Sequence, residues 1–218
     1  MRPGYGAWRV GVNLGLLALL LLLAPAARAA PVAILALGDS LTAGFGLAEA
    51  ESFPAQLQAA LVARGIAARV MNGGVSGDTS AGGLARLDWS LADKPDLVIL
   101  ELGANDALRG LDPAATRANL DAILARLKAA GVAVLIAGMR APPNMGAEYT
   151  QAFDAIFPEI AASHGVPLYP FFLDGVAVDR NLNQADLIHP TAAGTDVIVS
   201  RILPAVEELI AQARKERG

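Results

Sequence analysis

Five short apolar runs, separated by longer amphipathic stretches, most constrain what this chain of 218 residues can fold into. A strand that is apolar without alternation has to be buried on both faces, as in a parallel sheet covered by helices. The alternation of such runs with helical stretches predicts βαβ units and a three-layer α/β fold, with a doubly wound parallel sheet of about five strands. The runs are 32–37, 68–71, 97–102, 132–137 and 166–172.

The stretches between these runs carry helix signals. The clearest helix is predicted over 113–130, where Asp112 is placed to cap the N-terminus. A second is predicted over 149–165, with Pro158 bending it, and the last begins near residue 190. Helices of this length between parallel strands are what a doubly wound sheet requires.

Residues 1–29 have the organisation of a secretory signal peptide. Two arginines give a positive start, an apolar run covers 10–23, and small residues precede a cleavage point after Ala29. The apolar run is shorter than the roughly 20 residues that a membrane-spanning helix needs. We therefore expect cleavage to leave one domain, residues 30–218, without a stable membrane anchor. We expect this domain to be exported to the periplasm, or to be secreted if the cell has no outer membrane.

Charge and cysteine content exclude several classes of protein. The chain has 17 Lys and Arg against 21 Asp and Glu, a net charge of −4. Cleavage removes three arginines and no acidic residue, leaving 14 basic and 21 acidic groups and a net charge of −7. A nucleic-acid partner does not fit this balance. Cysteine is absent, which excludes a cysteine nucleophile, a thiolate zinc site and a disulfide framework.

Residues with reactive or hydrogen-bonding groups follow the first three predicted strands, where open parallel sheets bind their ligands. Ser40 lies on the first turn after the first strand. Gly77 belongs to a glycine-rich loop after the second strand, and glycine brings a backbone N–H close to a substrate oxygen. Asn105 follows the third strand and offers a side-chain amide as a second donor. A helix cap is the structural alternative for both Ser40 and Asn105.

Only His164 and His189 are available as a histidine base. His164 lies at the end of a predicted helix, where histidine favourably meets the helix dipole. His189 follows the last strand, and Asp186, three residues before it, can accept a hydrogen bond from the imidazole and hold its tautomer. Together with Ser40, these two residues have the types required for nucleophilic acyl transfer.

Four blocks of the sequence, taken in order, resemble the SGNH subgroup of the GDSL esterases and lipases. The likeness is strongest to the bacterial periplasmic acyl-CoA thioesterase I, lysophospholipase and arylesterase branch. The blocks are 38–44 (GDSLTAG), 75–79 (VSGDT), 103–106 (GAND) and 186–190 (DLIHP), within a resemblance that spans nearly all of 32–210. The third block usually has two glycines before the Asn, and Ala104 stands in place of the second.

The resemblance implies a flavodoxin-like sheet of order 2-1-3-4-5 and an esterase that needs no metal or cofactor. Ser40 would be the nucleophile, His189 the general base and then acid, and Asp186 the residue that orients it. The oxyanion hole would be the backbone N–H groups of Ser40 and Gly77 with the Asn105 side chain. The implied substrates are aryl and alkyl esters, thioesters such as acyl-CoA, and lysophospholipids. Their hydrolysis would proceed through an acyl-enzyme intermediate.

Two further segments, 107–111 and 140–146, resemble those that line the acyl groove in this branch. On that basis we expect Leu108, Leu111 and Met145 to contact the acyl chain. Ordinary apolar packing is the alternative for these three residues.

Three other functions fit parts of the sequence. A carbohydrate acetylesterase of the same fold would use the same residues on acetylated sugars. A magnesium-dependent, receiver-like domain would use Asp39, Asp78 and Asp106 as oxygen ligands, but it gives Ser40 and His189 no role. A non-catalytic binding protein would keep the fold without the reaction.

Overall fold

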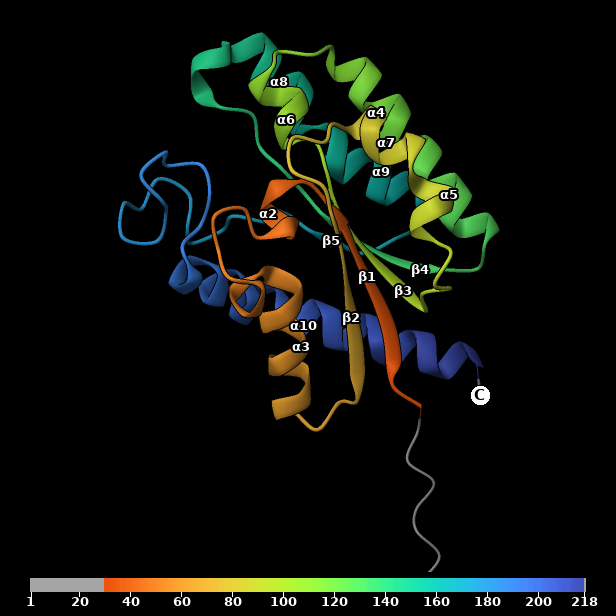
Figure 1. Cartoon of the computed structure of the whole chain (residues 1–218). Coiled ribbons are helices and arrows are strands. Elements are labelled where there is room, and N and C mark those ends of the chain that lie inside the picture. Colours follow the sequence, from red (N-terminus) through yellow and green to blue (C-terminus); the bar gives the residue numbers. More distant parts are fainter. Residues whose placement is uncertain (1–29, 218) are drawn as a thin grey trace, which may run out of the picture. The chain divides into compact units, whose positions relative to one another are not determined.

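Five strands form one parallel sheet at the centre of residues 30–217, which the computed structural model describes. The strands are β1 Val32–Gly38, β2 Ala68–Gly74, β3 Leu97–Glu101, β4 Ala133–Ala137 and β5 Leu168–Tyr169. Their order is β2-β1-β3-β4-β5, and every neighbouring pair is parallel (Figure 1). The predicted α/β class and strand order are confirmed. The predicted signal peptide, residues 1–29, lies outside the described residues.

Burial differs between the central and edge strands. β1, β3 and β4 are almost entirely buried, as continuous apolar strands between helical layers must be. β2 is an edge strand, and its residues are partly exposed. β5 is much shorter than the apolar run 166–172 that predicted it. Pro170 follows directly and has no N–H with which to extend the ladder.

Helices cover both faces of the sheet (Figure 1). One face carries α3 Phe53–Ala63 and α10 Ala192–Arg217, and the other carries α4 Ser80–Ala85, α5 Leu87–Ser90, α7 Pro113–Ala129, α8 Ala147–Asp154 and α9 Ile156–His164. Short elements at the carboxyl ends of strands are α2 Ser40–Ala43, α6 Ala104–Leu108 and the 3₁₀ helices η1 Glu49–Glu51 and η2 Pro143–Met145. The structure therefore has the three layers that the sequence predicted.

The predicted helices are found, with one correction. α7 matches the predicted helix 113–130, and the Asp112 side chain accepts a hydrogen bond from the Ala114 N–H at 2.9 Å. The predicted bent helix 149–165 is two helices instead, α8 and α9, which meet at Ala155. Pro158 explains the break, because its ring would clash with the carbonyl four residues earlier in a continuous helix.

The core lies between the sheet and both helical layers. Four of its largest fully buried side chains are Phe53, Phe153, Phe157 and Phe172. None of the helices within residues 30–217 has the length and apolar composition needed to cross a bilayer. Because all five strands are parallel, the segments that follow them meet at one edge of the sheet, and that edge carries the predicted site.

Candidate active site

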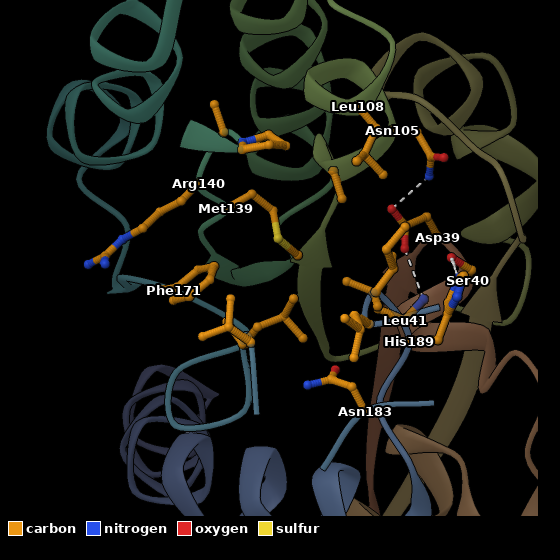
Figure 2. A pocket seen from close by; sticks show the side chains of 18 of the residues that line it. Asp39, Ser40, Leu41, Asn105, Leu108, Met139, Arg140, Phe171, Asn183 and His189 are labelled. Atoms are coloured by element: carbon orange, nitrogen blue, oxygen red, sulfur yellow. Dashed lines mark hydrogen bonds between the residues drawn. The ribbon is translucent and has the colours of Figure 1, made fainter. Parts of the chain in front are cut away.

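Ser40 is the first residue of α2, immediately after β1 and Asp39. Asp39 caps this helix, because its side chain accepts a hydrogen bond from the Leu41 N–H at 2.9 Å. The capping role considered for Ser40 is therefore filled by its neighbour. The Ser40 hydroxyl instead lies 2.9 Å from His189 Nε2, as the dashed line in Figure 2 shows.

His189 lies in the loop between β5 and α10, and it bonds Asp186 on its other side. Its Nδ1 is 2.6 Å from Asp186 Oδ2. The second carboxyl oxygen of Asp186 accepts from the backbone N–H groups of Ile188 and His189, each at 3.0 Å. Leu187 completes this tight turn in the left-handed conformation, with φ of 59°. The structure thus places Ser40, His189 and Asp186 in one hydrogen-bonded row.

The hydrogen bonds to Asp186 favour its charged form. The His189 side chain, followed by the two backbone N–H groups, lowers the pKa of this carboxyl from 3.8 to about 2. Asp186 is therefore ionised throughout the neutral range. An anion at this position stabilises a positive charge on His189 and keeps Nε2 turned toward Ser40.

The lowered pKa predicts how Asp186 contributes to stability. A carboxyl group whose pKa is lower in the folded chain than in the unfolded chain stabilises the folded chain. This contribution is fully present above about pH 4 and is lost as the pH falls through about 2. We expect Asp186→Asn to reduce the free energy of unfolding equally at pH 7 and pH 5, and by less between pH 4 and pH 2. Urea unfolding at each pH measures this. Asp179→Asn, in the same loop, is the matched control and should show no such loss; an Asp186 effect that faded already at pH 5 would contradict the assignment.

Asn105 lies in the first turn of α6 and points toward the start of α2. Its Nδ2 donates a hydrogen bond to Asp39 Oδ2 at 3.0 Å (Figure 2). Asp39 is fully buried, and burial raises the pKa of its carboxyl to about 6. This bond holds the Asn105 amide beside Ser40, and both side chains line the same cavity. Asn105 is not the N-cap of α6, since that position belongs to Gly103.

Gly77 lies in the loop after β2, in the left-handed conformation that glycine adopts at little cost, with φ of 83°. Its carbonyl accepts a hydrogen bond from Arg109 Nη2 at 2.7 Å. The next residue, Asp78, pairs with Arg86 at 2.5 Å, and Arg86 also donates to the Gly38 carbonyl at 2.9 Å. Arg86 therefore ties the Gly77 loop to the end of β1. Gly77 is exposed and is not among the described residues that line the cavity.

A cavity of about 480 Å³ opens beside Ser40 and His189. Leu108 lines it, whereas Leu111 and Met145 are not among its lining residues. Met145 lines a separate hollow beside α8. The Leu111 carbonyl accepts from the Tyr149 hydroxyl of α8 at 2.8 Å, which draws that segment away from the cavity. The prediction that Leu111 and Met145 contact the acyl chain stays a prediction, which the cavity beside Ser40 does not support.

Much of the cavity wall comes from the loop between β5 and α10, which sequence reasoning used only for Asp186 and His189. The apolar lining residues from this loop are Phe171, Leu173, Ala177, Val178, Leu187 and Ile188. Pro142 and Pro143, from the predicted segment 140–146, line it as well. The available signal was a run of large apolar residues in a segment without strand or helix periodicity. Val178 is 90 % exposed and Leu187 43 %, as in a wall that is open to solvent.

The magnesium alternative requires Asp39, Asp78 and Asp106 to converge on one point. The structure gives each a separate partner: Asp39 bonds Asn105, Asp78 bonds Arg86, and Asp106 accepts from the Ser80 N–H and hydroxyl. Within residues 30–217, no group of three or more His, Asp or Glu side chains is arranged to hold a metal ion. The three carboxylates instead join neighbouring segments of the sheet edge.

A serine, a histidine and an aspartate in one hydrogen-bonded row are the arrangement by which serine hydrolases are recognised, on whatever fold they occur. The sequence also matches the profile of the GDSL-like lipase/acylhydrolase family over residues 36–197. This match covers most of the chain. The chain belongs to the GDSL-like lipase/acylhydrolase family.

Individual relatives are similar over most of their length. Esterase TesA of Pseudomonas aeruginosa is 42 % identical over 197 residues, covering 90 % of this chain and 96 % of the relative. Thioesterase 1/protease 1/lysophospholipase L1 of Escherichia coli is 38 % identical over 183 residues, covering 84 % and 86 %. Among solved structures, the SGNH-hydrolase family esterase AlinE4 is 49 % identical and superimposes with a TM-score of 0.71, covering 84 % of this chain and 98 % of that one.

Proposed function

We propose that this protein is a serine esterase that hydrolyses carboxylic esters and thioesters through an acyl-enzyme. The observation that carries the proposal is the row from Ser40 through His189 to Asp186 at the mouth of a largely apolar cavity. A row of this kind activates a serine hydroxyl, and the apolar cavity beside it accommodates an acyl chain. The names of the relatives, which include an esterase and a thioesterase, support the same reaction.

The reaction proceeds in two halves. Ser40 Oγ attacks the substrate carbonyl carbon while its proton passes to His189 Nε2, and the ionised Asp186 stabilises the resulting imidazolium. His189 then gives this proton to the departing alcohol or thiol, leaving the acyl group on Ser40. In the second half, His189 takes a proton from water, the resulting hydroxide attacks the acyl-enzyme, and the acid is released as Ser40 regains its proton.

The negative oxygen that forms in each half needs donors that are already in place. We assign this role to the N–H of Ser40, the N–H of Gly77 and the Asn105 amide. Ser40 opens α2, where N–H groups have no partner within the helix. The Asn105 amide nitrogen carries two hydrogens, of which Asp39 accepts one, so the other is able to donate to substrate.

Asn105→Ala is expected to lower kcat by roughly 10² to 10³ while KM changes little, because an oxyanion donor acts mainly in the transition state. Steady-state hydrolysis of a p-nitrophenyl ester measures both constants. Asn181→Ala, in the exposed part of the loop before His189, is the matched control and should leave both unchanged. A kcat within a few-fold of wild type would mean that Asn105 only bonds Asp39.

The cavity favours an acyl chain over a sugar. Its walls beside Ser40 are formed largely by leucine, proline, methionine and phenylalanine side chains, and sugar hydroxyls would find few hydrogen-bond partners there. Fatty acyl esters, acyl thioesters and lysophospholipids share the required acyl chain. The carbohydrate acetylesterase alternative would depend on the few polar side chains of the lining outside the Ser40 row, which are Asp39, Asn105, Arg140 and Asn183.

Hydrolysis of p-nitrophenyl esters from acetyl to palmitoyl, beside an acyl-CoA and acetylated xylose, tests the proposal. We expect turnover that rises from acetyl to a medium chain, and weak turnover of the acetylated sugar. Leu108→Asp should selectively reduce turnover of the longer esters, whereas Leu111→Asp, also on an exposed leucine but outside the cavity, should not. Preference for the acetylated sugar would favour the carbohydrate alternative, and hydrolysis of none of these compounds would favour a binding protein.

We also propose that the protein acts outside the cytoplasm. The support is the sequence of residues 1–29, with its positive start, short apolar run and small residues before Ala30. Pro31–Gly218 form one compact unit, which fits a mature domain that begins at residue 30. N-terminal sequencing of the exported protein tests this, and a start at Met1 would contradict it.

A further inference from the structure

A buried carboxyl group that the reaction does not use lies directly behind the Ser40 turn, by which we mean residues 38–42. It belongs to Glu101, the last residue of β3, which has no exposed surface. Its Oε2 accepts hydrogen bonds from the Asp39 N–H at 3.2 Å and from the Thr42 hydroxyl at 2.7 Å. Glu101 therefore holds the Ser40 turn on both sides of Ser40.

The glycine at position 38 is what allows this approach. A Cβ at Gly38 would lie 2.5 Å from Glu101 Oε2 and would also overlap the Thr42 hydroxyl. A side chain at that position would have to push the carboxyl away from the backbone. The close packing of Gly38, Glu101 and Thr42 therefore fixes the turn from behind, where substrate does not reach.

The complete burial of Glu101, with one carboxyl oxygen left without a partner, favours an uncharged acid. The Asp39 N–H and the Thr42 hydroxyl both donate to Oε2 of Glu101, and Oε1 has no partner among the described residues. A carboxylate buried in this way would leave one charged oxygen unsatisfied, which is far more costly than a buried hydroxyl. Burial, and then the neighbouring Asp39 carboxyl, raise the pKa of Glu101 well above its ordinary value.

The other charged groups near this pair already have partners. Arg86 donates to the Gly38 carbonyl on the same turn, but its charge is paired with Asp78. His189 faces Asp39, and its Nδ1 bonds Asp186. Because the Arg86 charge is engaged by Asp78, it provides little reason for Glu101 to ionise.

We propose that Glu101, in its uncharged form, is a positioning residue for the esterase reaction, holding the Ser40 turn through the Asp39 N–H and the Thr42 hydroxyl. This rests on the proposed function. Glu101 does not touch substrate. It acts by fixing the direction of the Ser40 N–H and hydroxyl, and by fixing Asp39, whose carboxyl holds the Asn105 amide. A displacement of about 1 Å in such groups can cost on the order of 10² in rate.

Kinetics of Glu101→Gln and Glu101→Ala test the positioning role. Glutamine keeps a neutral group and an acceptor oxygen, so we expect kcat within about threefold of wild type. Alanine removes the acceptor, and we expect kcat to fall by roughly 10- to 100-fold with KM little changed. Val98→Ala, a buried cavity-forming change on the same strand, is the control for lost stability and should leave kcat unchanged at a temperature where it is folded. Equal kcat for Glu101→Ala and the control, or equal damage by Gln and Ala, would overturn the proposal.

Thr42→Val extends the test if Glu101→Ala does not fold. It keeps the side-chain shape and removes one of the two donors to Glu101, so we expect a fall in kcat of about threefold to tenfold, again with little change in KM. Wild-type kcat in this variant would contradict a role for the Glu101–Thr42 contact.

The pH dependence of unfolding tests the uncharged state without any hydrolysis assay. Above its ordinary pKa of 4.5, an unfolded chain has released the Glu101 proton, whereas the folded chain keeps it. Stability therefore falls as the pH rises, by up to about tenfold in the unfolding equilibrium constant per pH unit. As the pH rises above 4.5, we expect the unfolding equilibrium constant to increase more steeply in wild type than in Glu101→Gln. Parallel curves would show a charged Glu101 and overturn the proposal, whatever the outcome for ester hydrolysis.

Discussion

Ser40→Ala is expected to lower kcat for ester hydrolysis by about 10⁴- to 10⁶-fold. The Ser40 hydroxyl is the only group placed 2.9 Å from His189 Nε2 within the described part of the chain, and alanine offers no atom that can form the acyl-enzyme. The protein should remain folded, because Asp39, and not Ser40, caps α2. Steady-state kinetics on a p-nitrophenyl ester, beside thermal unfolding, measure both expectations.

The matched control for this variant is Ser163→Ala. Ser163 is an exposed serine of α9 whose hydroxyl donates to the Ile160 carbonyl. Its loss should leave kcat at the wild-type value. Substantial activity in Ser40→Ala would refute the nucleophile, and a cysteine nucleophile is not available in its place, because the chain has no cysteine.

His189→Ala is expected to be nearly as damaging, with kcat about 10⁴-fold or more below wild type. Without the imidazole, Ser40 has no base to take its proton, and the leaving group has no acid to protonate it. The second histidine of the chain, His164, provides the control. His164 ends α9, and its Nε2 lies 3.1 Å from Asp121 Oδ1 of α7, in a contact between two helices.

His164→Ala should therefore leave kcat and KM unchanged and lower only stability. Each variant removes one imidazole from a chain that has two, so any general effect of losing a histidine is matched. A large loss of kcat in His164→Ala, or a small one in His189→Ala, would reverse the assignment of the base. Added imidazole offers a further check, since partial recovery of His189→Ala would show that the missing group is a base.

The assignment of Ser40, Asp186 and His189 required only local information together with a rule about the fold. Apolar runs located the strands, and parallel strands bring the segments that follow them to one edge. Asp186 and His189 are three residues apart, so their contact is set by one turn of chain. The remaining contact, from Ser40 to His189, spans 149 residues, and the topology makes it possible.

The cavity was predicted less well, because its walls follow no periodic pattern. Leu111 and Met145 were expected there from their place in a resembling segment, yet Tyr149 and α8 hold that segment elsewhere. Phe171 lines the cavity although the apolar run 166–172 predicted a strand there, and Val178 lines it from a loop that has no strand or helix signal. Which apolar residues of a loop face a cavity depends on contacts with distant elements, and no spacing in the sequence records them.

The sequence by itself determined the fold class and the residue types of the hydrogen-bonded row, because hydrophobic periodicity and the residues that follow each strand are local properties. The strand order came from the family resemblance. Tertiary structure alone decided that Glu101 lies behind the Ser40 turn. In the sequence, Glu101 is a charged residue that ends an apolar strand. Its burial and its two hydrogen bonds arise only when β1 and β3 pair and bring Gly38 beside it, since a glycine leaves room there for a carboxyl group.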